Sequence, residues 1–242
     1  MVWVVLPVKD LVQAKTRLSG VLAPHERRTL AQAMVEDVLS VLEEVAEIEG
    51  ICVLSEDPAA DLLAHKYPIE VLSETELGCN GLNRVVAAGV QQLRQRGIRQ
   101  VMVMHSDLPL IQAPDVEALL HVFAQVDCDM VIAPDLAAKG TNVMVFDPQQ
   151  FDRFQYGPGS CQLHQNSAGA LGLQCRLYHN EHLGLDVDSP GDLLHLYHEL
   201  LAGQRSDHSA ELLLSAGVAQ RLSLIERAGL DPYAEVENHD AV

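Results

Sequence analysis

The sequence predicts an α/β domain built on one mostly parallel, doubly wound sheet with helices on both faces. Short aliphatic segments that suit buried strands alternate along the chain with longer segments of helical periodicity. Hydrophobic residues make up 48% of the 242 residues but aromatic residues only 4%, so aliphatic side chains must build the core, as they do in helix-covered sheets. Several polar loops follow predicted strands, which is where such sheets bind ligands.

The predicted strands are short and mostly aliphatic. They cover residues 2–6, 51–54, 69–72, 101–104, 130–133, 142–146, 173–178 and 183–188. The first is apolar at every position, which indicates a strand that is buried on both faces. Residues 147–165 are rich in Gly, Pro and Gln and are predicted as an irregular loop, within which Ser160 could open a helix.

Helices are predicted between and after the strands, over residues 24–45, 82–96, about 115–123, 190–201 and 210–230. Pro24 suits the first turn of its helix, and Gly97 ends the next one. Ser189-Pro190-Gly191-Asp192 places Ser at the N-cap, Pro at N1 and an acid at N3, which is close to a capping box. One domain is predicted over residues 1–202, and residues 203–242 are predicted as a helical, acidic C-terminal extension.

The net charge of −18 restricts the partners of this protein. An acidic chain argues against binding to nucleic acids or anionic membranes, both of which favour basic surfaces. No run reaches the ~20 apolar residues that span a bilayer, and the apolar N-terminus is too short for a signal peptide. The five cysteines are scattered without a C-x-x-C pair, as expected of reduced thiols. We therefore expect a cytoplasmic protein that binds small molecules.

Cations concentrate near the N-terminus, in the loop after the first strand. Lys9, Lys15 and Arg17 could converge there on a polyphosphate, because Arg offers a planar fork for phosphate oxygens and Lys a compact charge. The loop lacks G-x-x-x-x-G-K and G-x-G-x-x-G, so it is neither a Walker A loop nor a Rossmann fingerprint. The alternative interpretation is a solvated surface loop with salt bridges, which the spacing alone leaves open.

Carboxylates follow two later strands. Asp107, in Ser106-Asp107-Leu108-Pro109, lies at a strand end, where it could hold a Mg²⁺ that also touches phosphates. Asp186 and Asp188 point to one face of an extended segment and would repel each other unless a cation lies beside them. Asp188 is the better candidate of the two because it lies at a strand–helix junction. Each carboxylate has a structural alternative as a turn or helix cap.

Two Gly-rich segments and one Asn complete the candidates. Lys139-Gly140-Thr141-Asn142 and Tyr156-Gly157-Pro158-Gly159-Ser160 offer hydroxyl donors and backbone that a ligand can approach closely, although ordinary turns are the simpler explanation. His164 lies near the second segment and could contact an acidic ligand. Asn83, in Gly81-Leu82-Asn83, could bind a base or a sugar, or could cap the helix that follows.

In their order along the chain, these motifs resemble those of the 2-phospholactate/phosphoenolpyruvate guanylyltransferases of coenzyme F-420 biosynthesis, in the MobA-like nucleotidyltransferase superfamily. The shared motifs are Pro7-Val8-Lys9, Ala14-Lys15-Thr16-Arg17-Leu18, Gly81-Leu82-Asn83, Asp107-Leu108-Pro109, Gly140-Thr141-Asn142, Gly157-Pro158-Gly159-Ser160, His164 and Asp186-Val187-Asp188-Ser189-Pro190. The resemblance covers roughly residues 1–200. It departs at Lys139, where a second Gly is frequent, and at Ser106, where Gly or Ala is common.

The resemblance implies a Rossmann-like, GT-A-like nucleotidyltransferase fold that uses GTP and Mg²⁺. It implies transfer of GMP to phosphoenolpyruvate, 2-phospho-L-lactate or 3-phospho-D-glycerate, with release of pyrophosphate. By motif position, the implied catalytic residues are Lys15, Arg17 and Asp107, and the metal ligands are Asp107, Asp188 and Asp186. The implied nucleotide contacts are Pro7, Lys9, Lys15, Arg17, Gly81, Asn83 and Ser106, and the acceptor contacts are Thr141, Gly157, Ser160 and His164.

Other functions stay open on sequence alone. A related nucleotidyltransferase of the molybdopterin type would use another nucleotide, such as CTP, or another acceptor. A sugar-nucleotide glycosyltransferase would carry D-x-D after a central strand, whereas Asp186 and Asp188 come late in the chain. A non-catalytic subunit would bind GTP without turnover. The helix predicted over residues 210–230 could pack on a partner, so a homodimer is one expected assembly.

Overall fold

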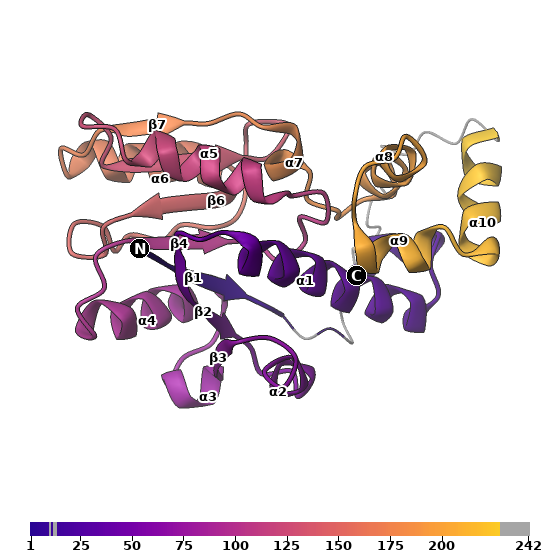
Figure 1. Ribbon diagram of the computed structural model, residues 1–242, viewed down its shortest axis with the longest axis horizontal. Coiled ribbons are helices and arrows are strands. Elements are labelled where there is room, and N and C mark those ends of the chain that lie inside the picture. Colours follow the sequence, from indigo (N-terminus) through magenta and orange to yellow (C-terminus); the bar gives the residue numbers. More distant parts are fainter. Residues whose placement is uncertain (10, 12–13, 228–242) are drawn as a thin grey trace, which may run out of the picture.

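The computed structural model describes residues 1–9, 11 and 14–227, and within them seven strands form one sheet of order β3-β2-β1-β4-β6-β5-β7 (Figure 1). The strands are β1 (Val2–Pro7), β2 (Ile48–Leu54), β3 (Ile69–Leu72), β4 (Val101–Met104), β5 (Met130–Pro134), β6 (Thr141–Phe146) and β7 (Cys175–Leu177). The described pairings are parallel except those of β6 with β4 and β5. The predicted α/β fold with a mostly parallel sheet is confirmed.

Helices connect and cover the strands. They are η1 (Thr16–Gly20, a 3-10 helix), α1 (Pro24–Glu44), α2 (Ala59–Leu63), α3 (Glu74–Leu77), α4 (Leu82–Gln95), α5 (Ala113–Phe123), α6 (Ser160–Ala170), α7 (Glu181–Gly184), α8 (Pro190–Leu201), α9 (Asp207–Leu213) and α10 (Ala216–Arg227). The four long predicted helices that end before residue 202 are present within a few residues of their expected bounds. The short elements η1, α2, α3 and α7 were not expected from the sequence.

The sheet separates two apolar cores, because alternate side chains of each strand point to opposite faces. Val4 of β1 packs with α1, α2 and α5 on one face, whereas Val5 packs with α4 and α6 on the other. Both side chains are fully buried. This two-sided burial is the reason why the first strand is apolar at every position.

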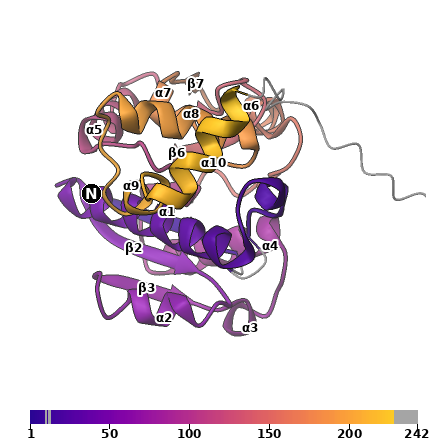
Figure 2. The same cartoon turned by 90° about the vertical axis from the view of Figure 1, so that its right-hand side faces the viewer.

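A third core joins the C-terminal helices to the start of α1. We call it the C-terminal helical cluster, and its buried side chains are Leu18, Leu22, Leu30, Met34, Leu110, Leu185, Val187, Leu193, Leu194, Leu196, Tyr197, Leu200, Leu213, Val218 and Leu222. Figures 1 and 2 show α8, α9 and α10 grouped beside α1 at one end of the molecule. The loop after β1 therefore packs on helices that come from the other end of the chain.

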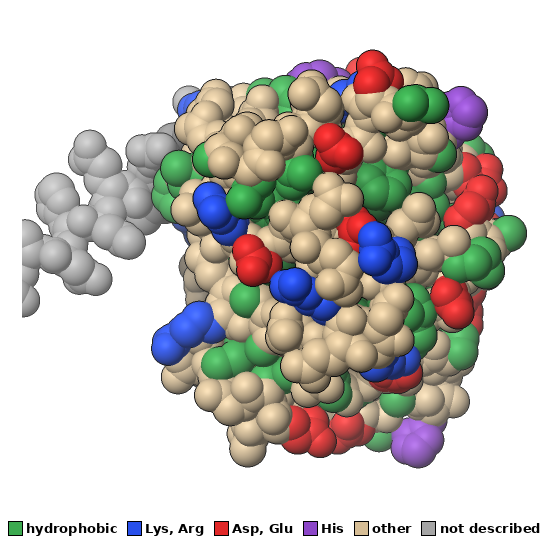
Figure 3. All heavy atoms as spheres, turned by 90° about the vertical axis from the view of Figure 1, so that its left-hand side faces the viewer, with side chains coloured by type: hydrophobic (Ala, Val, Ile, Leu, Met, Phe, Trp, Pro, Cys, Tyr) green, Lys and Arg blue, Asp and Glu red, His purple; other side chains and the backbone are tan. Residues whose placement is uncertain are grey.

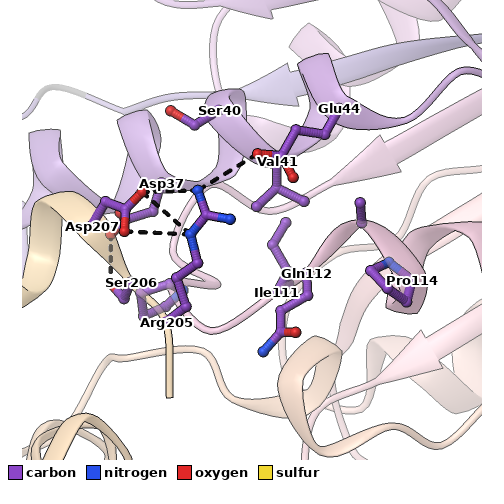
Figure 4. A pocket seen from close by; sticks show the side chains of 12 residues that line it. Asp37, Ser40, Val41, Glu44, Ile111, Gln112, Pro114, Arg205, Ser206 and Asp207 are labelled. Carbon is purple, nitrogen blue, oxygen red and sulfur yellow. Dashed lines mark hydrogen bonds and ion pairs between the residues drawn. The ribbon is translucent and has the colours of Figure 1, made fainter. Parts of the chain in front are cut away.

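Asp37 fixes the position of α9 on α1 (Figure 4). Its buried carboxylate accepts hydrogen bonds from Ser206 Oγ (2.9 Å) and from the backbone N–H groups of His208 (2.8 Å) and Ser209 (3.0 Å). The first N–H groups of a helix have no partner inside the helix. Asp37 thus caps α9 from a different helix, and its negative charge suits the positive end of the α9 dipole.

Two predictions for the second half of the chain were wrong. Residues 147–165 are not one loop, because α6 begins at Ser160, where the sequence indicated that a helix could open. Residues 183–188 form no strand, because the side chain of Asn180 accepts a bond from Leu183 N (2.9 Å) and starts the short helix α7. The following residues are extended, and Val187 N donates to Asp107 O over 3.2 Å.

The single helix predicted over residues 210–230 is also wrong in the described part, where α9 ends at Leu213 and α10 begins at Ala216. The cap supplied by Asp37 starts α9 earlier than the hydrophobic pattern indicates, and a new helix starts when Ser215 O accepts from Ala219 N over 2.9 Å. Residues 228–230 of that prediction lie outside the described residues. α9, which belongs to the predicted C-terminal extension, packs against α1 of the predicted first domain. The boundary between the two at residue 202 therefore stays a prediction.

The end of the molecule that faces away from α8, α9 and α10 shows basic and acidic side chains interspersed on its surface (Figure 3). Among the described helices, none combines the length and the apolar character that crossing a membrane requires.

Candidate active site

Lys15 lies between two carboxylates that arrive from distant parts of the chain. Its Nζ is 2.5 Å from Asp107 Oδ2 and 2.8 Å from Asp188 Oδ1. Burial alone would lower the pKa of Lys15, but attraction to Asp107 and Asp188 outweighs it and raises that pKa above its usual range. The backbone of Lys15 has φ 55° and ψ 40°, a left-handed conformation that is uncommon for a residue with a side chain. The two ion pairs hold the residue there.

Asp107 follows β4 and has one carboxylate oxygen without a partner. Burial would raise its pKa, but the charge of Lys15 lowers it to about 2, so the carboxylate is ionised at neutral pH. Among the described residues, Asp107 Oδ1 is buried and has no hydrogen-bond partner. A buried charged oxygen without a partner is costly in free energy and marks a place where a cation or donor would be stabilising.

Asp186 belongs to the same group of acids, and Asn142 of β6 fixes its segment. Asn142 Nδ2 lies 3.1 Å from each of three acceptors, which are Leu183 O, Gly184 O and Asp186 Oδ1. Burial, together with the negative charge of Asp107, raises the pKa of Asp186 to about 6. The three acids of the sequence prediction are therefore close enough to influence one another. Asn142, which the sequence placed in a candidate segment without this role, is a supporting residue.

Lys9, which follows β1, and Arg17, in η1, have exposed side chains. Within the part of the chain that the structure describes, neither takes part in an ion pair. Pro7 ends β1, and Ser106 precedes Asp107 in the loop after β4. These residues are near the β1 and β4 ends, but no described contact assigns them a ligand.

A second group of polar residues surrounds the Gly-rich loop before α6. His164 is fully buried, and its Nε2 accepts a hydrogen bond from Gln155 N over 2.9 Å. Because a backbone N–H can only donate, Nε2 carries no proton and Nδ1 donates to Thr141 Oγ1 over 3.0 Å. Burial lowers the pKa of His164 to about 4, so the ring is neutral at neutral pH.

The loop itself needs two glycines. Gly157 has φ 131° and Gly159 has φ 74°, both in the region that side chains disfavour. Gly159 precedes Ser160, which is the buried first residue of α6. At this helix start the first two N–H groups are already used, because Ser160 N donates to Gly157 O and Cys161 N to Lys139 O, each over 3.0 Å. The second bond joins the loop before α6 to the Lys139–Gly140 segment before β6.

His105 connects the two groups. Its backbone N donates to Asn142 O over 2.9 Å, and its ring centroid lies 5.3 Å from that of Tyr156. The Tyr156 ring in turn lies 4.9 Å from the ring of His164. The carboxylates after β4 and the Gly-rich loop are thus neighbours in space. The sequence prediction missed His105, which lies two residues before Asp107, and it named Tyr156 in a Gly-rich segment without a role of its own.

The side-chain amide of Asn83 is hydrogen-bonded to the backbone of Tyr156. Tyr156 N donates to Asn83 Oδ1 over 2.6 Å, and Asn83 Nδ2 donates to Tyr156 O over 3.1 Å. Gly81 is the N-cap of α4, with φ 82°. The predicted nucleotide contacts at Gly81 and Asn83 therefore lie directly beside the predicted acceptor loop.

Among the described residues, no three His, Cys, Asp or Glu side chains are already arranged around one point as metal ligands. The ammonium group of Lys15 lies between Asp107 and Asp188, where it neutralises both. The site as a whole combines carboxylates, a buried cation, exposed cations and a Gly-rich loop. Its charged residues follow the carboxyl ends of β1 and β4 or lie in the segment just before α8. This arrangement suits a ligand that carries several phosphates.

The comparisons with known proteins agree with this arrangement. A family model described as "Guanylyl transferase CofC like" matches residues 2–224, which include α9 and most of α10. The phosphoenolpyruvate guanylyltransferase of Conexibacter woesei is 36% identical over 201 residues, which are 83% of this chain and 89% of that protein. The 2-phospho-L-lactate guanylyltransferase of Methanothermobacter thermautotrophicus is 31% identical over 209 residues, which are 86% of this chain and 88% of that protein.

The fold has a counterpart among solved structures. A crystal structure from Desulfovibrio desulfuricans G20, provisionally assigned as a nucleotide-diphospho-sugar transferase, superposes with a TM-score of 0.73 at 20% identity and covers 91% of this chain and 97% of that one. This similarity confirms the predicted nucleotidyltransferase-like α/β fold. The match of the family model over nearly the whole chain, together with relatives above 30% identity, shows that this chain belongs to the CofC-like guanylyl transferase family.

Proposed function

We propose that this protein transfers GMP from GTP to a small phosphorylated carboxylic acid, with release of pyrophosphate, in coenzyme F-420 biosynthesis. The observation that carries the proposal is the contact of Lys15 with Asp107 and Asp188, next to the Thr141–His164 pair and the Gly-rich loop. The names of the relatives support the same reaction with phosphoenolpyruvate or 2-phospho-L-lactate as acceptor. The candidate acceptors are these two acids and 3-phospho-D-glycerate.

Asp107 and Asp188, with Asp186 beside them, are the residues that we propose as ligands of Mg²⁺. They fit this role because all three offer carboxylate oxygens, the donors that Mg²⁺ prefers, and because Asp107 Oδ1 is buried without a partner among the described residues. When bound, Mg²⁺ would neutralise charge on the phosphates of GTP and on the leaving pyrophosphate.

The proposed reaction is an in-line displacement. A phosphate oxygen of the acceptor attacks the α-phosphorus of GTP, a new P–O bond forms, and the bond from the α-phosphorus to the bridging oxygen of the β-phosphate breaks. Pyrophosphate leaves with that electron pair. The attacking phosphate is already ionised at neutral pH, so the reaction requires no general base.

The residues of this chain then act by position and charge. Lys15, Arg17 and Lys9 are the proposed phosphate contacts, and their positive charges would stabilise the charge of the transition state. Thr141, Gly157 and Ser160 are the proposed acceptor contacts. His164, which the sequence also suggested as a contact, is fully buried with both ring nitrogens bonded to Gln155 N and Thr141 Oγ1, so we propose that it supports Thr141 instead. Neutral His164 orients the Thr141 hydroxyl, because its Nδ1–H donates to Thr141 Oγ1 and leaves the hydroxyl proton free for the acceptor. Holding both reactants in one geometry accounts for most of the expected acceleration.

The experiment measures pyrophosphate release with Mg²⁺ and GTP in the presence of each of the three phospho-acids. The product is unstable, so the reaction is coupled to the next enzyme of the pathway with the deazaflavin precursor. Release with GTP and one acid identifies the reaction and its acceptor. Release with CTP instead of GTP, or GTP binding without release for any acid, contradicts the proposal.

A further inference from the structure

Asn83 forms a two-point contact with the backbone of a residue 73 positions away in sequence. Its Oδ1 accepts from Tyr156 N over 2.6 Å, and its Nδ2 donates to Tyr156 O over 3.1 Å. Both groups of one side-chain amide are therefore used on one residue. This pairing has the geometry of a backbone pair in a sheet, yet it joins the first turn of α4 to an irregular loop.

The identity of residue 83 is constrained by this contact. Tyr156 N–H can only donate and Tyr156 C=O can only accept, so only a side chain with an acceptor and a donor at its two ends satisfies both. Asp has the size of Asn but would place a negative oxygen against Tyr156 O. An aliphatic residue would leave both backbone groups without this partner, which costs about 1–3 kcal/mol for a buried group.

The contact holds the loop that carries the proposed acceptor contacts. Gly157 follows Tyr156 directly, and Ser160 comes three residues after Gly157. On the other side, His164 Nε2 accepts from Gln155 N over 2.9 Å. The Tyr156 ring packs between the rings of His105 and His164. The loop is thus fixed from α4, from α6 and from the residue two positions before Asp107.

We infer that Asn83 is a positioning residue for the acceptor loop rather than a contact to the base or sugar of the nucleotide. The inference rests on the proposed function, because it assigns the loop to the acceptor. Asn83 holds the backbone of Tyr156, which directly precedes Gly157, so its loss weakens binding of the phosphorylated acid. GTP binding stays nearly unchanged, because the two bonds to Tyr156 direct the amide toward the acceptor loop.

The test uses the full-length protein with Asn83→Asp and Asn83→Ala. The control is Asn166→Ala, which removes the same kind of side chain from an exposed position of α6, where it only accepts from Gln162. The first readout is hydrogen exchange by mass spectrometry in peptides that contain residues 152–160, without any substrate. The second readout is the KM for the acceptor and the KM for GTP.

Both Asn83 variants are expected to exchange the Tyr156 amide at least tenfold faster than the wild type. They are also expected to raise the KM of the acceptor about tenfold while the KM of GTP changes less than twofold. Unchanged exchange overturns the inference, and so does a raised KM for GTP with an unchanged KM for the acceptor. If the wild type transfers GMP to no acid, the proposed function fails, while the exchange experiment still decides whether Asn83 holds the loop.

Discussion

Lys15 and Asp107 depend on each other at the centre of the candidate site. The ammonium group is nearly buried, with 9% of its side chain exposed, and is stabilised there by Asp107 and Asp188. A buried charge that loses all of its partners is strongly destabilising. With two partners, however, Lys15 retains one when the other is neutralised, so function and stability can be separated by mutation.

Asp107→Asn is expected to reduce kcat at least 100-fold while the protein stays folded. The substitution keeps the shape of the side chain but removes the charge that we propose for metal binding, and Asp188 still pairs with Lys15. Steady-state kinetics and circular dichroism measure the two effects. Asp61→Asn, at an exposed position of α2, serves as the control. Activity within a few-fold of the wild type would rule out the metal assignment.

The lowered pKa of the buried His164 leads us to expect that the stability of the protein depends on pH. The pKa of His164 is about 4 in the folded state, because burial lowers it from 6.5. A depressed pKa means that the unfolded chain binds the proton more readily than the folded protein does. The free energy of unfolding is therefore unaffected by the titration of His164 above pH 6.5 and decreases as the pH falls toward 4. At pH 5 the expected loss is about 2 kcal/mol, since one pKa unit corresponds to about 1.4 kcal/mol.

His164→Gln should remove this component, so the free energy of unfolding should fall less between pH 7 and pH 5 than in the wild type. Urea unfolding at the two pH values measures the difference. His179→Gln, at an exposed position, should leave the pH dependence as it is. Equal pH dependence in all three proteins would show that His164 does not titrate in this way.

At the level of elements, the N-terminus of α9 depends on a carboxylate from α1. Asp37→Asn is expected to destabilise the protein by about 1–3 kcal/mol, because an amide cannot accept from Ser206 Oγ, His208 N and Ser209 N together. Chemical denaturation measures the change. Asp207→Asn, which removes an exposed ion pair with Arg205 and one negative charge from the first turn of α9, should change the free energy of unfolding by less than about 1 kcal/mol.

The same elements explain where the hydrophobic pattern predicted helices well and where it did not. α1 and α4 are long and have sequence signals at their ends, such as Pro24 and Gly97, and their bounds were predicted closely. α9 starts at a cap that comes from Asp37, far away in sequence. A helix end that is determined by a distant partner leaves no signal in the local sequence, so α9 and α10 were predicted as one helix.

At the level of the whole molecule, the candidate site lies where the C-terminal helical cluster meets the sheet. Lys15 directly precedes η1, whose Leu18 is buried in the cluster, and Asp188 directly precedes Ser189, the N-cap of α8. Asp107 comes from the sheet. The three charged groups therefore join two parts of the molecule, so the position of the C-terminal helices affects the loop after β1.

Arg221 of α10 makes this connection testable. Its Nε donates to Val21 O over 3.2 Å, and its Nη2 lies 2.6 Å from Glu26 Oε1. Glu26 also accepts from Ala23 N at the start of α1. Arg221→Ala is expected to raise the KM of GTP about 3- to 10-fold by loosening the loop that holds Lys15, and to cost no more than about 1 kcal/mol of stability.

Steady-state kinetics and thermal unfolding measure the two effects, with Arg227→Ala, near the end of the same helix and exposed, as the control. A loss of stability with an unchanged KM for GTP would show that α10 supports the fold but not the nucleotide loop.

The sequence by itself determined the fold class, the family and the residue types of the site. The alternation of aliphatic strands with amphipathic helices is a local property, and the motifs carry their chemistry in the side chains of Lys15, Asp107, Asp188 and Thr141. These features can be predicted because each depends on neighbours within a few residues.

Only the tertiary structure decided which of these side chains meet. In the folded chain Lys15 lies between Asp107 and Asp188, and Asn83 is hydrogen-bonded to Tyr156. Strand β6 runs antiparallel to its neighbours, and His105 and Asn142 support the site. The physical reason is that each of these contacts joins residues dozens of positions apart, and strand order and packing, not local pattern, bring such residues together.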